Sequence, residues 1–153
     1  MKNTLIEVSS ILNQEFLVIP LLYGSFALQE VLGKDYQAKD IDLLISNDVL
    51  RNKIDLIQAF VMKGFTYINK EVLTFEKNGI EIEISNLEQW IKNSNWNMNE
   101  NILVSQKEVR YHLLSAKNLE RLYLYLTNDK RRSKEKKQKD QEKLSDLKMF
   151  LER

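Results

Sequence analysis

The chain of 153 residues has no cysteine, one proline, one histidine and four glycines. The absence of cysteine excludes a disulfide framework, a zinc–thiolate site and a thiol nucleophile. Basic and acidic residues nearly balance, and the net charge of +1 argues against a protein that coats nucleic acid through bulk charge. No apolar run reaches the roughly 18 residues of a membrane span, and Glu7 and Glu15 interrupt the stretch where a signal peptide would be apolar. We therefore expect a cytoplasmic protein.

The length suits a single domain, since one core commonly serves about 100–200 residues. With 43% hydrophobic and 29% charged residues, the composition is that of a globular protein. Apolar periodicity predicts an α+β fold, in which helices flank a mixed β-sheet and a helical extension forms the C-terminal third. We expect an α/β core over residues 1–114 and C-terminal helices over residues 115–153, packed together as one compact domain.

Local signals predict the individual elements. Thr4, followed by Glu7, has the spacing of a capping box and predicts the start of the first helix. Ser25 and Ser115 are expected helix caps, and residues 93–101 are expected to form a surface loop. The other predicted helices cover residues 26–32, 47–63 and 87–92, and a helical stripe covers 144–151. The predicted strands cover residues 17–23, 41–46, 65–68, 72–76, 80–85 and 109–114. Pro20 cannot donate a hydrogen bond to the ladder, so it is expected to mark an edge or the start of the first strand.

Two acidic residues stand at the start of an otherwise apolar strand, in the segment Asp40-Ile41-Asp42-Leu43-Leu44-Ile45. Because alternate side chains of a strand share a face, Asp40 and Asp42 are expected to lie together. Two adjacent carboxylates repel one another, and a hard divalent cation such as Mg²⁺ removes that repulsion. An amphipathic strand that carries two aspartates by chance is the alternative, although aspartate is depleted in strands.

A second acidic strand follows in Ile80-Glu81-Ile82-Glu83-Ile84-Ser85. Glu81 and Glu83 share the face opposite the three isoleucines. Alternating Ile and Glu is also typical of a half-exposed antiparallel strand, and that reading is favoured for this strand alone. On a strand beside Asp40 and Asp42, however, a third acid would complete a two-metal site or a site with one metal and a base.

The pair Gly24-Ser25 stands between a predicted strand and a predicted helix. Glycine at such a turn lets the backbone approach a ligand closely, and the free N–H groups of a helix start can bind phosphate. The order of motifs is therefore Gly-Ser, a short helix, Asp-x-Asp at a strand start and a later acidic strand.

This order resembles the nucleotidyltransferase superfamily, which has the DNA-polymerase-beta-like fold. The segments that carry the resemblance are Tyr23 to Leu28, Lys39 to Ile45 and Phe75 to Ser85. The C-terminal segments Leu114 to Leu119 and Lys139 to Leu147 are similar to helices of small, stand-alone aminoglycoside-type and lincosamide-type nucleotidyltransferases. The resemblance implies that Gly24 and Ser25 hold the outer phosphates of a nucleoside triphosphate (NTP). It also implies that Lys39 contacts a phosphate or neutralises the site.

The same resemblance implies that Asp40 and Asp42 bind Mg²⁺, with two ions present during catalysis. A third acid would bind metal or deprotonate an acceptor hydroxyl; Glu83 is favoured for this role and Glu81 is held in reserve. The implied reaction is the attack of a hydroxyl on the α-phosphorus of the NTP, with release of pyrophosphate. An antibiotic-like small molecule is the expected acceptor.

Other functions remain open at this point. A protein acceptor, as in toxin-type members, is one alternative. A non-catalytic, antitoxin-like subunit that binds a protein partner or forms a homodimer is another. Nucleic-acid binding is disfavoured, because the basic run Lys130 to Lys139 lacks interleaved aromatic residues; that run is expected to be a solvated face, with phosphate contact as its alternative. His112 and Trp96 are read as packing residues, although Trp96 could also border an acceptor pocket.

Overall fold

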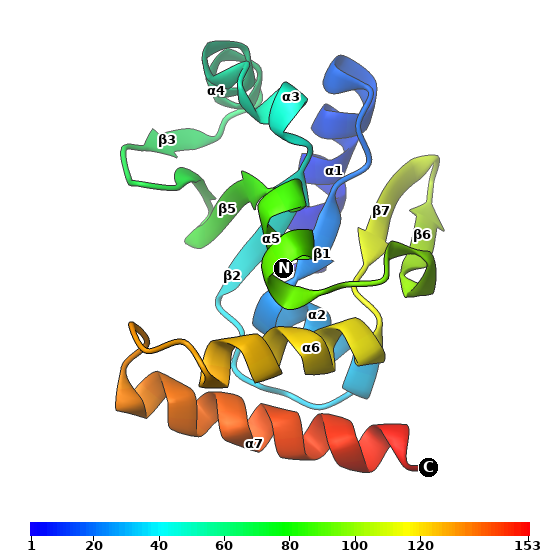
Figure 1. Ribbon diagram of the computed structural model, residues 1–153. Coiled ribbons are helices and arrows are strands. Elements are labelled where there is room, and N and C mark those ends of the chain that lie inside the picture. The colour runs from blue at the N-terminus through cyan, green and yellow to red at the C-terminus, as the bar shows by residue number, and fades with distance from the viewer.

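The computed structural model describes residues 1–153 as one mixed β-sheet surrounded by helices (Figure 1). The sheet has seven strands in the order β3-β4-β5-β2-β1-β7-β6. The strands are β1 (Leu21–Tyr23), β2 (Asp40–Ile45), β3 (Thr66–Ile68), β4 (Leu73–Lys77), β5 (Ile80–Asn86), β6 (Ile102–Gln106) and β7 (Val109–Leu113). Strand β2 pairs antiparallel with β1 and parallel with β5, so the expected α+β class with a mixed sheet is confirmed.

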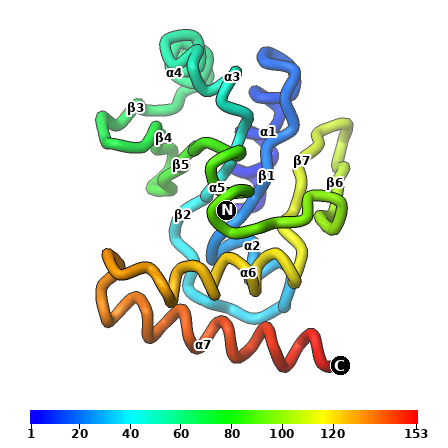
Figure 2. Tube along the Cα trace, in the orientation of Figure 1, coloured from blue at the N-terminus to red at the C-terminus, as the bar shows by residue number.

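Seven α-helices and one 3₁₀ turn accompany the sheet. They are α1 (Lys2–Phe16), α2 (Gly24–Leu32), α3 (Asn47–Leu50), α4 (Lys53–Met62), α5 (Leu87–Ser94), η1 (Met98–Glu100), α6 (Ala116–Thr127) and α7 (Lys134–Leu151). Helices α6 and α7 pack side by side along one end of the molecule, as the trace in Figure 2 shows. None of the helices has the length and apolar character needed to cross a membrane.

Strand β2 lies at the centre of the sheet and of the core. Its residues Ile41, Leu43, Leu44 and Ile45 are fully buried, so both faces of the strand are covered beyond its first three residues. Burial of each such side chain contributes roughly 1.5–3 kcal/mol. The strand is therefore held firmly, and the acidic residues at its beginning have a rigid base.

The C-terminal helices share this core. Leu119 and Leu122 of α6 and Leu147 of α7 are buried in the same apolar cluster as the sheet residues. Ser115 caps α6, because its Oγ accepts a hydrogen bond of 3.1 Å from the Asn118 backbone N–H, as the sequence predicted. The two helices are thus fixed relative to the central strands.

Three of the predicted boundaries are wrong. The first helix begins at Lys2, and Thr4 lies buried inside it instead of capping it. Residues 47–63 form two helices with a break at Arg51 and Asn52, which allows Leu56 and Phe60 of α4 to turn into the core. The first strand begins at Leu21, so residues 17–20 lie outside it, and Pro20 directly precedes the strand start as expected for a residue that cannot donate to the ladder.

The region after α5 also differs from the prediction. Trp96 is only 6% exposed, so residues 93–101 do not form a surface loop throughout. Its ring packs 6.3 Å from the ring of Tyr23 and 6.4 Å from that of Trp90, which confirms the packing interpretation of this tryptophan. Strand β6, which forms an edge of the sheet, was not predicted; its exposed Ile102 and Leu103 do not follow an alternating pattern.

Candidate active site

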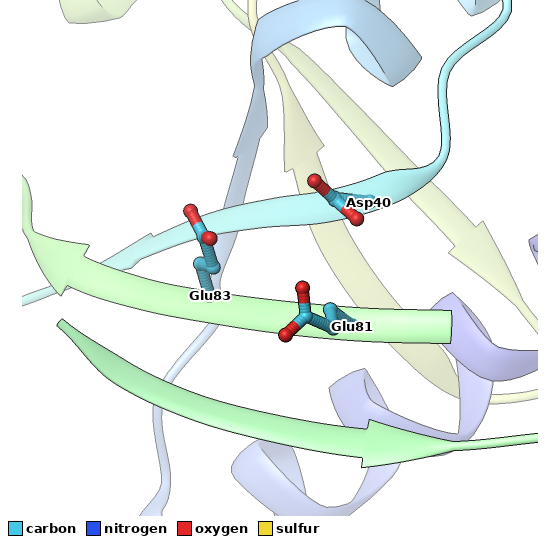
Figure 3. Close-up of side chains that lie close together, drawn as sticks. All are labelled: Asp40, Glu81 and Glu83. Carbon is cyan, nitrogen blue, oxygen red and sulfur yellow. The ribbon is translucent and has the colours of Figure 1, made fainter. Parts of the chain in front are cut away.

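Four carboxylates meet where β2 and β5 lie side by side. The parallel register places Asp40 opposite Glu81 and Asp42 opposite Glu83. Carboxylate oxygens of Asp40, Glu81 and Glu83 lie within 4.8 Å of one another, and all three side chains are drawn in Figure 3. Residues far apart in the sequence are therefore brought together by strand pairing alone.

Asp42 lies deeper in the site than Asp40 and turns toward the start of α2. Its Oδ2 lies 2.5 Å from the position that a Cβ would occupy on Gly24. Burial, followed by the nearby carboxylates of Glu83 and Asp40, raises the pKa of Asp42 to about 7. Burial, followed by the charge of Glu81, also raises the pKa of Asp40. The ionised forms of Asp40 and Asp42 are therefore destabilised in the protein without a ligand.

Gly24 allows this close approach. Its φ of +77° is unfavourable for any residue with a side chain, and an added Cβ would collide with the Asp42 carboxylate. Helix α2 begins at Gly24, so its first backbone N–H groups lie beside Asp42. The prediction that Ser25 caps this helix is wrong, since Tyr23 occupies the capping position and makes no side-chain bond there.

Ser25 instead contacts the C-terminal helix. Lys143 Nζ of α7 donates a hydrogen bond of 3.0 Å to Ser25 Oγ. The same ammonium lies 5.4 Å from the ring centroid of the buried Tyr123. Burial lowers the pKa of Lys143, which means that its charged form is destabilised in the free protein. An anionic ligand beside the ammonium would stabilise that form.

A second cation is fixed by a buried acid. Arg132, in the turn before α7, binds the Asp140 carboxylate with two nitrogens; its Nη2 lies 3.1 Å from Oδ1 and its Nε donates to Oδ2. Asp140 is fully buried, whereas the Arg132 side chain is 26% exposed. The planar pairing holds the guanidinium in one orientation at the edge of the site.

These groups line one cleft of about 1060 Å³ between the sheet and α7. Asp40, Asp42 and Glu83 form an acidic side of the cleft. Six cations also line the cleft, namely Lys34, Lys39, Arg132, Lys136, Lys139 and Lys143. Asp140, Glu142 and Asp146 of α7 line the same side, where Asp140 pairs with Arg132 and Asp146 with Lys34. The volume is sufficient for a drug-sized or nucleotide-sized ligand.

Among these cations, Lys39, Lys136, Lys139 and Lys143 form no ion pair within the chain. The sequence did not identify Arg132, Lys136 or Lys143 as site residues. For Arg132 and Lys136 the signal was the basic run Lys130 to Lys139, whose alternative interpretation was phosphate contact, whereas Lys143 lies beyond that run. Which lysines face the cleft depends on how α7 is rotated against α6, and the composition of the run does not show that.

Glu81 differs from the other acids because it already has a cationic partner. Lys70 Nζ, from the segment between β3 and β4, lies 2.6 Å from Glu81 Oε1. Glu81 does not line the cleft between the acids and α7. Of the two glutamates that the sequence left open, Glu83 therefore lies in the cleft and Glu81 beyond it.

The chemistry of the donor set suits a hard divalent cation. All donors are carboxylate oxygens, which Mg²⁺ prefers, and no cysteine or histidine competes. The oxygens of Asp40 and Glu83 lie close together, and Asp42 lies directly opposite Glu83 in the strand pairing. The residues present thus fit Mg²⁺, and no rearrangement of the backbone is needed to bring the carboxylates together.

No protein-family model matches the chain. The protein YnaI of Bacillus subtilis (strain 168), described as uncharacterized, is 29% identical over 150 residues, which span 97% of this chain and 96% of YnaI. The chain and YnaI are therefore similar over nearly their whole lengths.

Solved structures share the fold at much lower identity. A nucleotidyltransferase-like antigenic protein from Paracoccidioides brasiliensis aligns with a TM-score of 0.63 and 16% identity over 94% of this chain and 73% of its own. ANT(2″)-Ia in complex with adenylyl-2″-tobramycin gives 0.60 and 13% over 97% and 88%. The lincomycin-bound lincosamide adenylyltransferase LnuA gives 0.56 and 14% over 97% and 96%. The chain has the nucleotidyltransferase fold, so the resemblance stated from its motifs is confirmed.

Proposed function

We propose that the protein transfers a nucleoside monophosphate from an NTP to a hydroxyl group of a small-molecule acceptor in a Mg²⁺-dependent reaction. The observation that carries this proposal is the cleft with an acidic side and a cationic side. A nucleotide with bound divalent ions has both kinds of charge, because its phosphates are anionic and its metal ions are cationic. A cleft of this form therefore complements a metal–NTP complex.

The cationic side is proposed to bind the outer phosphates. Lys143 and Ser25 lie beside the N-terminus of α2, where free backbone N–H groups add further donors. Lys136 and Lys139 extend the cationic side along α7, and Arg132 is held rigidly by Asp140. Lys39 approaches from the start of β2. Charge-assisted bonds of this kind are stronger than neutral hydrogen bonds.

Asp40, Asp42 and Glu83 are proposed to hold Mg²⁺, with two ions present when substrates are bound. Bound Mg²⁺ would supply charge stabilisation for the attacking and leaving oxygens. The chain's own contribution is to fix these carboxylates on two paired strands and to keep Asp42 against Gly24. Burial and the neighbouring carboxylates raise the pKa of Asp42, and a bound Mg²⁺ would stabilise its ionised form.

The proposed transfer forms one bond and breaks one bond at the α-phosphorus. A bond forms between the acceptor oxygen and the α-phosphorus, and the bond from the α-phosphorus to the pyrophosphate oxygen breaks. The hydroxyl proton would pass to a carboxylate of the site, and Glu83, which lies opposite Asp42 in the strand pairing, is the candidate. Pyrophosphate leaves toward Lys143 and α7. The protein acts mainly through position and electrostatics.

A small-molecule acceptor is supported by the structures that share the fold, two of which are named for tobramycin and lincomycin derivatives or complexes. The test is pyrophosphate release from each of the four NTPs with Mg²⁺ and a panel of hydroxyl-bearing antibiotics. We expect turnover with one donor and at least one acceptor, and a loss of about 100- to 1000-fold in Asp40→Asn and Asp42→Asn, of the size that removing an electrostatic catalytic group causes.

The matched control is Asp48→Asn, because Asp48 is an aspartate with an 87% exposed side chain on α3 outside the cleft. Its turnover should equal that of the wild type. Full function of the protein in its host with both Asp40 and Asp42 replaced would contradict the proposal. It would support instead a non-catalytic subunit that binds a protein partner.

A further inference from the structure

The loop that joins α2 to β2 forms one wall of the cleft. Residues 34–39 of this loop all line the cleft, although they form neither helix nor strand. The residue that follows them is Asp40, the first of the acidic group on β2. The conformation of the α2–β2 loop therefore determines both the shape of the cleft and the position at which β2 begins.

A side chain of α2 holds the middle of the α2–β2 loop. Gln29 Oε1 accepts two hydrogen bonds of 2.8 Å, one from the backbone N–H of Tyr36 and one from that of Ala38. Gln37, between them, has a left-handed φ of +56°, so the backbone turns around the Gln29 oxygen. Backbone donors need a partner when no regular ladder supplies one, and here one side-chain oxygen serves two of them.

Helix α7 holds the same loop through Asp146. The Tyr36 hydroxyl donates a hydrogen bond of 2.6 Å to Asp146 Oδ2, and Lys34 Nζ lies 3.0 Å from the same oxygen. The Lys34 ammonium also lies 5.3 Å from the centroid of the Tyr36 ring. The ring is therefore fixed in orientation by its hydroxyl, by its backbone N–H and by a neighbouring cation.

The cations that are free to bind phosphate lie toward the N-terminal half of α7. Lys136 and Lys139 line the cleft and form no ion pair within the chain. Lys143, one turn further along the helix, bonds to Ser25 at the start of α2. A triphosphate is attracted to this part of the cleft.

The end of the cleft beside the α2–β2 loop has the opposite character. Asp35 and Asp146 line it, and Glu142 lies one turn before Asp146 on α7. The cation at this end, Lys34, is already paired with Asp146. Lys39, at the other end of the loop, adjoins the acidic group on β2. Carboxylates repel a triphosphate, so the uncharged part of a nucleotide is favoured here.

The apolar surface of the cleft is found at this same end. Among the residues that line the cleft, only Tyr36 and Ala38 are apolar or aromatic, and both belong to the α2–β2 loop. A nucleoside has an aromatic base that needs such a surface, whereas a phosphate does not. Aromatic side chains commonly contact bases, and this contact differs little among bases because each base has a π-face.

We propose that the α2–β2 loop binds the nucleoside part of the NTP, with the ring of Tyr36 against the base, and that Gln29 is the positioning residue that holds the loop for this contact. The proposal rests on the proposed function and assigns the two parts of the donor to the two ends of the cleft. It adds affinity for the nucleoside without strong selection among the four bases.

The experiment compares two ligands that share their phosphates. One is a non-hydrolysable ATP analogue with a methylene group between its α- and β-phosphates, and the other is inorganic tripolyphosphate, each titrated calorimetrically with Mg²⁺. We expect Tyr36→Ala to weaken binding of the analogue about tenfold, as loss of a base–aromatic contact does, and to leave tripolyphosphate within about threefold of the wild type. Tyr36→Leu, which keeps an apolar side chain, repeats the test with less disturbance of the loop.

Gln29 is tested with two substitutions. Gln29→Leu removes the oxygen that accepts the two backbone bonds, so we expect it to weaken the analogue about tenfold and tripolyphosphate by less than about threefold. Gln29→Glu keeps an acceptor oxygen at the same position and should bind the analogue within about threefold of the wild type. A side chain that mattered only for packing would not be replaced better by glutamate than by leucine.

Tyr67→Ala and Gln58→Leu are the matched controls. Tyr67 is a half-buried tyrosine on β3 and Gln58 is an exposed glutamine on α4, and neither lines the cleft. Both variants should bind the two ligands as the wild type does. Tripolyphosphate binding also reports in every variant that the cleft is folded.

The outcomes separate this proposal from the proposed function. Binding of the analogue that is unchanged in both Tyr36→Ala and Tyr36→Leu, or that falls only as much as binding of tripolyphosphate, overturns the nucleoside assignment. Equal binding of the analogue by Gln29→Leu and Gln29→Glu overturns the positioning role of Gln29. A wild type that binds neither ligand contradicts the proposed function itself.

Discussion

The Asp42 side chain packs directly against the backbone of Gly24. The Asp42 carboxylate fills the space where any side chain at Gly24 would lie, and Gly24 has a left-handed φ of +77°. The contact joins β2 to the start of α2, which are the two elements that the proposed function assigns to metal ions and phosphate. The geometry of the site therefore depends on the absence of one methyl group.

Replacement of Gly24 by alanine should displace Asp42 and weaken binding of Mg²⁺–NTP by at least tenfold, because the added Cβ meets the carboxylate at 2.5 Å. We also expect a loss of about 1–3 kcal/mol in the free energy of unfolding from backbone strain and displacement. Calorimetric titration and thermal unfolding measure the two effects. Gly79→Ala is the matched control, because Gly79 has nearly the same φ of +78° but open space around it. Equal nucleotide binding in both variants would contradict this explanation.

The pKa of Asp42 predicts how stability depends on pH without metal. Its pKa is raised from 3.8 to about 7 in the folded protein, so the folded state binds the proton more tightly than the unfolded state does. The contribution of Asp42 to stability is therefore greatest below about pH 4 and is lost as the pH rises to about 7. The loss is on the order of 2–4 kcal/mol, at about 1.4 kcal/mol per pH unit.

Asp42→Asn should remove this slope and raise the free energy of unfolding at pH 8 relative to the wild type. Urea unfolding at pH 4, 6 and 8 in the presence of a chelator measures the difference, and Asp48→Asn should leave the slope unchanged. Saturating Mg²⁺ should stabilise the wild type at pH 8 and have little effect on Asp42→Asn. A wild-type slope that persists in Asp42→Asn would contradict the account.

Lys143 is expected to strengthen the binding of the NTP. Lys143→Met removes the ammonium beside Ser25 while it keeps much of the apolar stem against Tyr123. We expect the KM for the NTP to rise roughly 10- to 100-fold, as for loss of a charged hydrogen bond. Steady-state kinetics at saturating acceptor measures it. Lys148→Met, on an exposed position of the same helix, should have no effect; a KM that does not change in Lys143→Met would assign the phosphates to other residues.

Loss of the buried ion pair between Arg132 and Asp140 should destabilise the protein more than loss of the exposed pair formed by Asp48. Asp140→Asn leaves the half-buried guanidinium without its charge partner and should lower the free energy of unfolding by about 3 kcal/mol. Asp48→Asn breaks an exposed pair with Arg51 and should cost less than about 1 kcal/mol. Chemical denaturation of both variants provides the comparison. Similar losses in the two would show that burial of Asp140 does not strengthen its pairing.

The central strands could be predicted from the sequence because their residues carry a strong period of two. Alternation at Asp40 to Ile45 and Ile80 to Ser85, with the turn at Asn78-Gly79, indicated both acidic strands and their shared faces. Strand pairing then placed the acids opposite one another, although only the structure shows the register. The order of the motifs along the chain was sufficient to predict the fold, because each motif marks the start of a different strand or helix.

Other features depend on tertiary contacts that no local pattern reports. The break at Asn52 follows from the way α4 turns Phe60 into the core, and Trp96 is buried by neighbours on β1 and α5. The cationic side of the cleft depends on how α7 packs on α6, because the basic run has lysines on several faces of the helix. Glu81 and Glu83 share a face of one strand, so only the partner of each residue separates their roles.

The most direct test of the account is whether the protein binds an NTP only with Mg²⁺ and only with Asp42 intact. Calorimetric titration with each of the four NTPs, with Mg²⁺ or with EDTA, measures this for the wild type and for Asp42→Asn. The account predicts that at least one NTP binds the wild type with Mg²⁺, and that EDTA and Asp42→Asn each weaken this binding at least tenfold. Binding that is equally strong in EDTA and in Asp42→Asn, or no binding of any NTP, would contradict it.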